Sequence, residues 1–136
     1  MSARAGCFGC APENRAGLRL RFREAAGELV SAVTLGSEYE SHPGVIHGGI
    51  VATVLDETMA RAAQRGRGGA VVTVGLRVRF LEPMRSQHRY LARASAVAEQ
   101  GQSLTLRGEL WGRELIAVAE GVFRVLPAER GGGEDA

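Results

Sequence analysis

The chain has 136 residues, a hydrophobic content of 45% and a formal net charge of +2, which suits one packed domain and excludes an enzyme with a separate cofactor domain. All 17 basic residues are arginine, so chemistry that needs a lysine, such as Schiff-base catalysis, is excluded. The arginines are spread along the chain, which does not favour nucleic-acid binding, and no apolar run approaches the roughly 20 residues that span a bilayer. We therefore expect a cytoplasmic protein without a nucleic-acid or membrane partner.

Two cysteines, Cys7 and Cys10, open the chain with two residues between them. This spacing suits a tight turn, a metal knuckle or a redox pair. A four-ligand zinc site needs a second cysteine pair, which the sequence lacks, so a metal would need a histidine or a second subunit. A cytosolic disulfide is not expected. A tight turn is the simplest interpretation, and we assign no metal ligand and no cofactor.

The first predicted elements form a hairpin. Leu18, Leu20 and Phe22 alternate with arginines over 18–23, the pattern of a strand with one polar face. A turn at 25–27 separates it from a second strand over 28–35. Residues 36–46 are expected to be irregular.

A helix is predicted over 48–65. Gly66 and the glycines after it end the pattern. The apolar residues recur at three- and four-residue spacing, which indicates one buried stripe formed by Val51, Val54, Leu55, Thr58 and Ala62.

Four strands follow the helix, at 70–81, 89–98, 103–111 and 114–126, and the segment 127–136 is expected to be a flexible tail. This order predicts an α+β domain over 1–126, in which one helix packs on a six-stranded antiparallel sheet. The strand at 89–98 has small or apolar residues on both faces, so it is either central or faces a partner. Since one helix cannot cover both faces of such a sheet, we expect association with a second copy.

The predicted helix carries two features with chemical potential. Asp56 is the one aspartate before the tail, on a face that is otherwise small and apolar. Gly48 and Gly49 begin the helix, where backbone N–H groups lack partners and are able to stabilise a developing oxyanion. Gly48 and Asp56 are roughly 12 Å apart along the axis, so one carbonyl cannot contact both. A site that uses both must be shared between two subunits.

The motif His47–Gly48–Gly49, followed at a fixed spacing by Asp56, resembles the hotdog-fold thioesterases of the PaaI-like, phenylacetate-degradation type. Residues 72–83 resemble the strand that follows the helix in this family, and residues 7–18 resemble the opening of one subset. The resemblance covers the chain to about residue 126. It implies a hotdog fold, with a long central helix wrapped by the six-stranded sheet, and hydrolysis of an acyl-CoA thioester by a homodimer or a tetramer of dimers.

The resemblance also implies roles for particular residues. Asp56 matches the catalytic acid, which acts as a general base on water or as a nucleophile. The Gly48 N–H matches the group that polarises the thioester carbonyl, His47 shapes the turn, and Thr73 supplies a hydroxyl near the water.

Substrate contacts are expected around the same motif. Where some family members carry an asparagine or glutamine that positions water, this chain has Ser41, a shorter donor. Apolar residues near the helix are expected to meet the acyl group, and arginines after it are expected to meet the phosphates of coenzyme A. The expected substrate-binding residues are Ser41, Val45, Ile46, Gly49, Met59, Arg77, Arg79 and Arg85.

Two alternatives stay open. The first is a hotdog protein that binds acyl-CoA without catalysis, although a carboxylate beside an anionic ligand argues against it. The second is an enoyl-CoA hydratase or dehydratase that uses His47 with Glu57. The acyl group and the arrangement of the dimers are not determined by the sequence.

Overall fold

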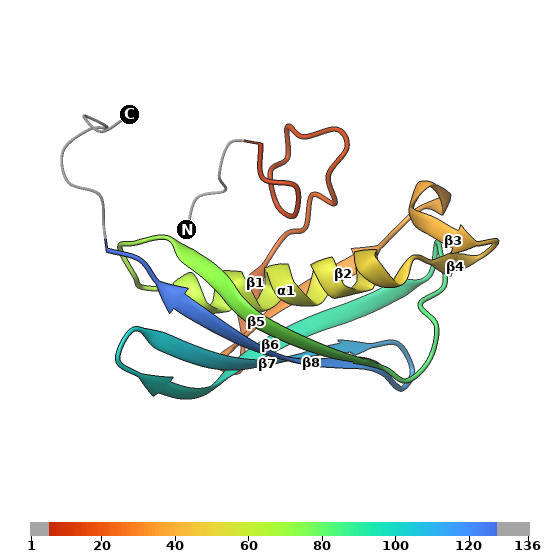
Figure 1. The fold of residues 1–136 in the computed structure, drawn as a ribbon. Helices are drawn as coiled ribbons and strands as arrows, with labels where there is room; N and C mark the ends of the chain where they lie inside the picture. Colours follow the sequence, from red (N-terminus) through yellow and green to blue (C-terminus); the bar gives the residue numbers. More distant parts are fainter. Residues whose placement is uncertain (1–5, 128–136) are drawn as a thin grey trace.

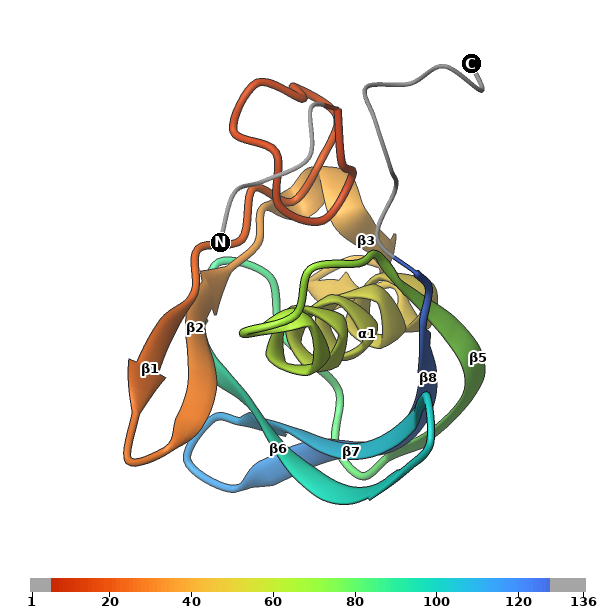
Figure 2. The same cartoon turned by 90° about the vertical axis from the view of Figure 1, so that its left-hand side faces the viewer.

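The computed structural model describes residues 6–127 and contains one long helix, α1 (Gly48–Gln64), that lies along an antiparallel sheet (Figure 1). Seen along the helix, the sheet curves around it (Figure 2). The α+β hotdog architecture expected from the sequence is confirmed. The predicted tail at 127–136 lies outside the described residues except for Pro127.

The main sheet has six strands in the order β1-β2-β6-β7-β8-β5, and all neighbours are antiparallel. The strand at 89–98 is therefore central, between β2 and β7, whereas β5 forms an edge. The bounds are β1 (Arg23–Ala25), β2 (Glu28–Thr34), β5 (Val71–Phe80), β6 (Arg89–Gln100), β7 (Ser103–Trp111) and β8 (Leu115–Val125).

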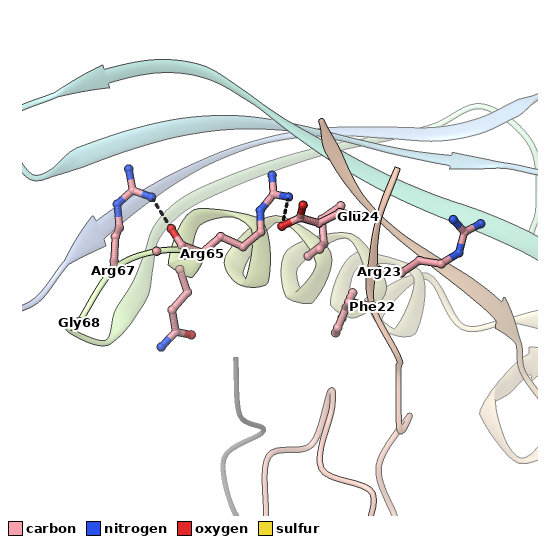
Figure 3. Close-up of a pocket in the computed structure, with 9 residues that line it drawn as sticks. Phe22, Arg23, Glu24, Arg65, Arg67 and Gly68 are labelled. Carbon is pink, nitrogen blue, oxygen red and sulfur yellow. Dashed lines mark hydrogen bonds and ion pairs between the residues drawn. The ribbon is translucent and has the colours of Figure 1, made fainter. Parts of the chain in front are cut away.

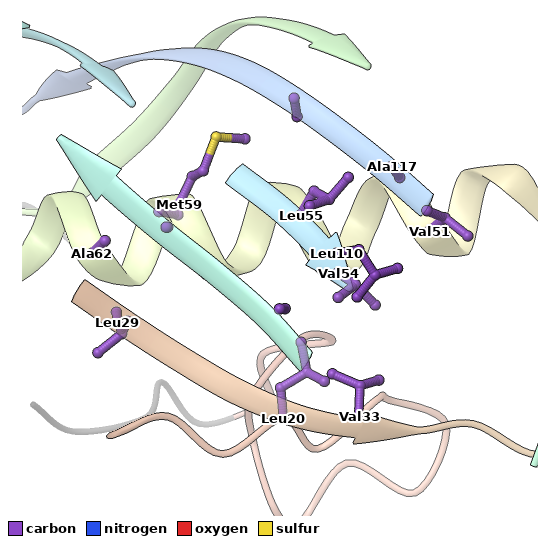
Figure 4. Packing of buried hydrophobic residues seen from close by; sticks show 14 of the residues in the cluster. Leu20, Leu29, Val33, Val51, Val54, Leu55, Met59, Ala62, Leu110 and Ala117 are labelled. Carbon is purple, nitrogen blue, oxygen red and sulfur yellow. The ribbon is translucent and has the colours of Figure 1, made fainter. Parts of the chain in front are cut away.

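The core lies between α1 and the concave face of the sheet (Figure 4). The predicted helix stripe is buried as expected. Small residues on the strands let the helix approach closely, because a Cβ at Gly108 or at Gly121 would lie 3.1 Å from Met59 side-chain atoms. Alternate residues of β7 and β8 point into this core, and their neighbours face outward.

The expected strand at 18–23 is wrong. Leu18 and Leu20 are buried as the alternation predicted, but Arg19 between them has a positive φ of 55°, which breaks the extended backbone. The amides of Leu18 and Leu20 donate to the carbonyls of Phe8 and Gly9 instead of to a strand. The segment 6–22 is thus a loop that covers the helix on the side away from the sheet (Figures 1 and 2).

The segment before α1 is more ordered than expected. A 3₁₀ turn, η1 (Ser37–Tyr39), leads into a small hairpin of β3 (Glu40–His42) and β4 (Val45–Ile46). Pro43 and Gly44 form its turn, and Gly44 has the φ of +81° that a type II turn requires. Sequence patterns missed it because these strands are too short for any periodicity to show.

Among residues 6–127, no helix has the length and apolar character needed to cross a bilayer.

Candidate active site

Asp56 and Thr73 lie in direct contact between α1 and the edge strand β5. The Thr73 hydroxyl donates a hydrogen bond of 2.8 Å to Asp56 Oδ1. Within residues 6–127, Asp56 Oδ2 has no such donor. One oxygen of the carboxylate is therefore held in place, and the other is free to accept a proton or to attack an electrophile.

A β-bulge explains why Thr73 faces the helix. The register with β8 shifts between Thr73 and Gly75, so Val74 is the extra residue and is 56% exposed. Without the shift, the period of two would place Thr73 on the same face as Arg77 and Arg79. The bulge moves it to the inner face, opposite Asp56.

The environment of Asp56 perturbs its acidity. Burial raises the pKa of this carboxyl above its ordinary value of 3.8, the Thr73 hydrogen bond lowers it, and the adjacent Glu57 carboxylate raises it further; the net direction is upward. A carboxyl with a raised pKa is a better proton acceptor when ionised. Such groups gather at functional sites.

The start of α1 offers a free backbone donor. Two amides of the first turn, those of Ile50 and Val51, donate to the His47 carbonyl, and the Gly49 amide donates to His47 Nδ1 at 2.8 Å. The exposed Gly48 amide has no hydrogen-bond partner among residues 6–127. Gly48 is therefore the one of the two glycines whose N–H is available to an incoming carbonyl oxygen.

His47 caps the helix through its side chain. Because Nδ1 accepts from Gly49, the neutral ring carries its proton on Nε2. We expect His47→Ala to lower the free energy of unfolding by about 1 kcal/mol, the usual cost of losing an N-cap, and His47→Asn to retain most of it. Urea unfolding of the two variants measures this difference. An Ala variant with the same free energy of unfolding as the wild type would contradict the capping role of His47.

A pocket of about 350 Å³ lies beside Gly48. Three of the other expected residues line it, namely Ser41, Val45 and Ile46. Its position is set by contacts across the chain: the Ile46 amide donates to the Met84 carbonyl at 2.8 Å. The wall is largely apolar and is completed by Val51, Phe80, Leu81, Glu82, Pro83 and Met84.

Sequence reasoning missed the wall contributed by residues 80–84. The available signal was the apolar pair Phe80–Leu81 just before Pro83, where a strand must end. What local patterns do not reveal is the pairing of residues 84–86 with residues 44–46, which brings the segment 80–84 to the helix start.

The remaining expected substrate contacts are dispersed. Gly49 lines a separate pocket of about 430 Å³ with His47. Arg85 is exposed, and its backbone forms an isolated antiparallel β-bridge with Val45. Arg77 and Arg79 line a hollow on the outer face of the sheet, away from Asp56. Met59 is 0% exposed under the sheet, so it is a core residue and not a pocket residue.

The largest cavity described, about 760 Å³, lies at the opposite end of α1 (Figure 3). Two of its three arginines already have partners: Arg65 pairs with Glu24 at 3.1 Å, and Arg67 donates to the Ala63 carbonyl at 2.8 Å. The end of a 17-residue helix is about 25 Å from its start. This cavity is therefore remote from Asp56 and Gly48 and is not the candidate site.

Comparisons with known proteins agree on one family. The family described as "Thioesterase superfamily" matches residues 43–118. A mutant of the phenylacetic acid degradation protein PaaI from Thermus thermophilus is similar at 28% identity, with a TM-score of 0.71, over 80% of this chain and 95% of that one. A Bacillus halodurans protein crystallised with CoA is similar at 25% identity and a TM-score of 0.71, over 82% of this chain and 77% of that one.

A further crystallised thioesterase superfamily protein is similar at 25% identity and a TM-score of 0.75. The match covers 82% of this chain but 59% of that longer one. No curated protein matches the sequence.

Proposed function

This chain belongs to the thioesterase superfamily, and we propose that it is an acyl-CoA thioesterase that releases a free acid and coenzyme A. The observation that carries the proposal is the ionisable Asp56, anchored through one oxygen by Thr73 and open at the other. The relatives described as PaaI and as a protein with CoA support the choice of substrate class.

The proposed reaction uses two groups of the protein. Asp56 either removes a proton from water, which attacks the thioester carbonyl, or attacks that carbonyl itself. The unpartnered Gly48 N–H, at the positive end of the helix dipole, stabilises the oxyanion that forms. Collapse of the tetrahedral intermediate then expels the thiolate of coenzyme A. On the general-base route this thiolate takes up the proton held by Asp56. On the nucleophilic route water hydrolyses the resulting aspartyl anhydride, which releases the free acid and restores Asp56.

The proposed site is shared by two copies of the chain. Gly48 and Asp56 lie about 12 Å apart on one helix, so Asp56 is expected to act with the partner's Gly48. The edge strand β5 supports self-association, because its outer edge is unpaired within residues 6–127 and carries exposed apolar side chains. These are Val72, Val74, Leu76 and Phe80, with Leu81 just beyond the strand. The partner surface is thus proposed on β5 and not on the strand at 89–98.

The two ends of the substrate are assigned from the pocket beside Gly48. Its apolar wall is proposed to hold the acyl group. Arg85, exposed next to Val45, is the arginine best placed for a coenzyme A phosphate. Arg77 and Arg79 would meet it only from the outer face of the sheet.

A cytoplasmic location stays a prediction.

The hydratase alternative is weaker in this geometry. The Glu57 carboxylate that a hydratase would use is already engaged by Arg61 and by the Cys7 thiol. A protein that only binds acyl-CoA would not need a carboxyl with a raised pKa, so the binding-only alternative does not account for Asp56.

Coenzyme A release from a panel of aryl, short-chain and medium-chain acyl-CoAs tests the proposal directly. We expect release from at least one substrate well above the uncatalysed rate. Hydration of an enoyl-CoA without hydrolysis would support the hydratase instead. Tight acyl-CoA binding without turnover would support a binding protein.

Thr73 should set the pH dependence of this reaction. Its hydroxyl stabilises the ionised form of Asp56, so Thr73→Val is expected to raise the Asp56 pKa. Because the reaction needs the carboxylate, the acidic limb of the kcat/KM profile should move to higher pH, with the largest loss of rate at low pH. Thr105→Val, on the outer face of β7, is the matched control and should leave the profile unchanged. If the acidic limb of the kcat/KM profile stays in place in Thr73→Val, Thr73 does not affect the group that titrates there.

A further inference from the structure

The loop at 6–22 meets α1 at a cluster of three donor side chains. The sulfur atoms of Cys7 and Cys10 and a carboxylate oxygen of Glu57 all lie within 4.8 Å of one another. Cys7 Sγ is 3.6 Å from Glu57 Oε2, and Cys10 is 7% exposed. We propose that Cys7, Cys10 and Glu57 bind one divalent metal ion, with zinc as the best match.

The spacing of the donors suits tetrahedral zinc. Zinc binds sulfur at about 2.3 Å and carboxylate oxygen at about 2.0–2.2 Å, which places neighbouring ligand atoms roughly 3.5–3.8 Å apart. The Cys7–Glu57 separation already has this value, so the cluster needs only a small contraction. Two soft thiolates with one carboxylate favour zinc over magnesium or calcium, which prefer oxygen donors.

The loop between the cysteines is shaped around the carboxylate. Gly9 packs directly on Glu57, because a Cβ there would lie 2.5 Å from Glu57 Cδ. Backbone hydrogen bonds fix the turn on both sides: the Ala11 amide donates to Cys7 O at 3.0 Å, and the Leu20 amide donates to Gly9 O at 2.9 Å. The donors are therefore brought together by a built contact between the loop and the helix.

The charges around the cluster balance when a divalent ion is present. Arg61 is 5% exposed, and its Nε lies 3.5 Å from Glu57 Oε2. Its Nε and Nη1 have no hydrogen-bond partner within residues 6–127. Binding of the ion releases the two thiol protons to solvent. The two thiolates and the Glu57 carboxylate then carry three negative charges, which the divalent ion and the Arg61 guanidinium neutralise. Arg61 would also orient the carboxylate as an outer-shell partner.

The ion would fasten the loop to the helix. Residues 6–22 form no strand or helix, so their attachment depends on a few buried side chains and the hydrogen bonds named above. Metal binding by groups that converge only in the folded chain adds directly to folding stability. Three protein donors leave a fourth position for water or another small ligand.

Cobalt titration of the reduced, full-length protein tests this site. We expect one Co²⁺ per chain, with thiolate-to-metal charge-transfer absorption, and competitive displacement by Zn²⁺. Cys10→Ser and Glu57→Gln should each weaken binding at least tenfold. Glu114→Gln, which removes an exposed carboxyl in the turn before β8, is the matched control and should bind normally. Circular dichroism establishes that each variant is folded, and zinc content by mass spectrometry checks the wild type independently.

Three results would overturn the proposal. The first is a reduced wild-type protein that binds neither Co²⁺ nor Zn²⁺ at micromolar concentration. The second is Glu57→Gln binding as tightly as the wild type, since the cysteines would then act without the helix. The third is a Cys7–Cys10 disulfide that forms in air, together with a metal content that does not rise when this disulfide is reduced. That result would identify the two cysteines as a redox pair.

Discussion

Replacing Asp56 with asparagine should reduce acyl-CoA hydrolysis by about 10²–10⁴-fold, the usual contribution of a positioned acid or base. Asparagine retains a carbonyl oxygen that accepts the Thr73 hydrogen bond, but it has no basic or nucleophilic carboxylate. The measurement is kcat/KM on the best substrate of the acyl-CoA panel. Turnover close to the wild-type value in a folded variant would contradict the role of Asp56.

The same variant should be at least as stable as the wild type at neutral pH. Because the Asp56 pKa is raised in the folded state, the folded protein binds this proton more tightly than the unfolded chain does. The Asp56 contribution therefore lowers stability progressively as pH rises from the ordinary value of 3.8 through the raised pKa. Asparagine removes that cost, so Tm at pH 7 should stay equal or increase. A large fall in Tm would indicate a structural role.

A single turnover in ¹⁸O-labelled water distinguishes the two proposed roles of Asp56. A general base delivers solvent oxygen to the released acid in the first turnover. A nucleophile whose anhydride is hydrolysed at the aspartyl carbonyl delivers an oxygen of its own carboxylate to the acid, and the label then enters the protein. Label in the protein after one turnover therefore identifies a nucleophile.

Replacing Gly48 with proline should lower kcat by about 10²–10³-fold, the typical loss on removing one oxyanion donor. Proline deletes the N–H but suits the first position of a helix, where that group makes no intrahelical bond. The preceding residue is compatible as well, since the ψ of His47 is 136°, outside the α region that proline disfavours in the residue before it. Helix α1 should therefore remain intact.

Gly48→Ala is the matched control for this change. It keeps the N–H and adds a Cβ at an ordinary contact distance of 3.8 Å from Phe80. The Ala variant should lose less than tenfold in kcat, although the methyl group narrows the site. Equal losses in both variants would indicate that shape, and not the amide, is what matters at Gly48.

Mixing the Asp56→Asn and Gly48→Pro variants tests the shared site. In a mixed dimer, one of the two sites would combine an intact Asp56 with the partner's Gly48. Random exchange would restore about a quarter of the wild-type activity, because half of the dimers are mixed and each has one good site of two. No recovery after denaturation and joint refolding would place both groups within one chain.

The local order of the sequence determined the helix and most of the sheet. The recurrence of Val51, Val54 and Leu55 at helical spacing identified α1, and glycines marked both of its ends. The four strands after the helix were predicted to within a few residues, because half-buried strands alternate along the chain. The isolated position of Asp56 on an apolar helix face likewise identified it as a candidate before any contact was known.

The contacts that complete the candidate site were decided by the tertiary structure. A one-residue bulge at Val74 turns Thr73 toward Asp56, and a local alternation pattern carries no record of such a shift. The segment around Met84 reaches the helix start through non-local hydrogen bonds. Glu57 reaches Cys7 and Cys10 only because the N-terminal loop folds over α1. Periodicity reports which face of an element is buried; register, bulges and loop packing depend on partners distant in the chain, so only the folded molecule specifies them.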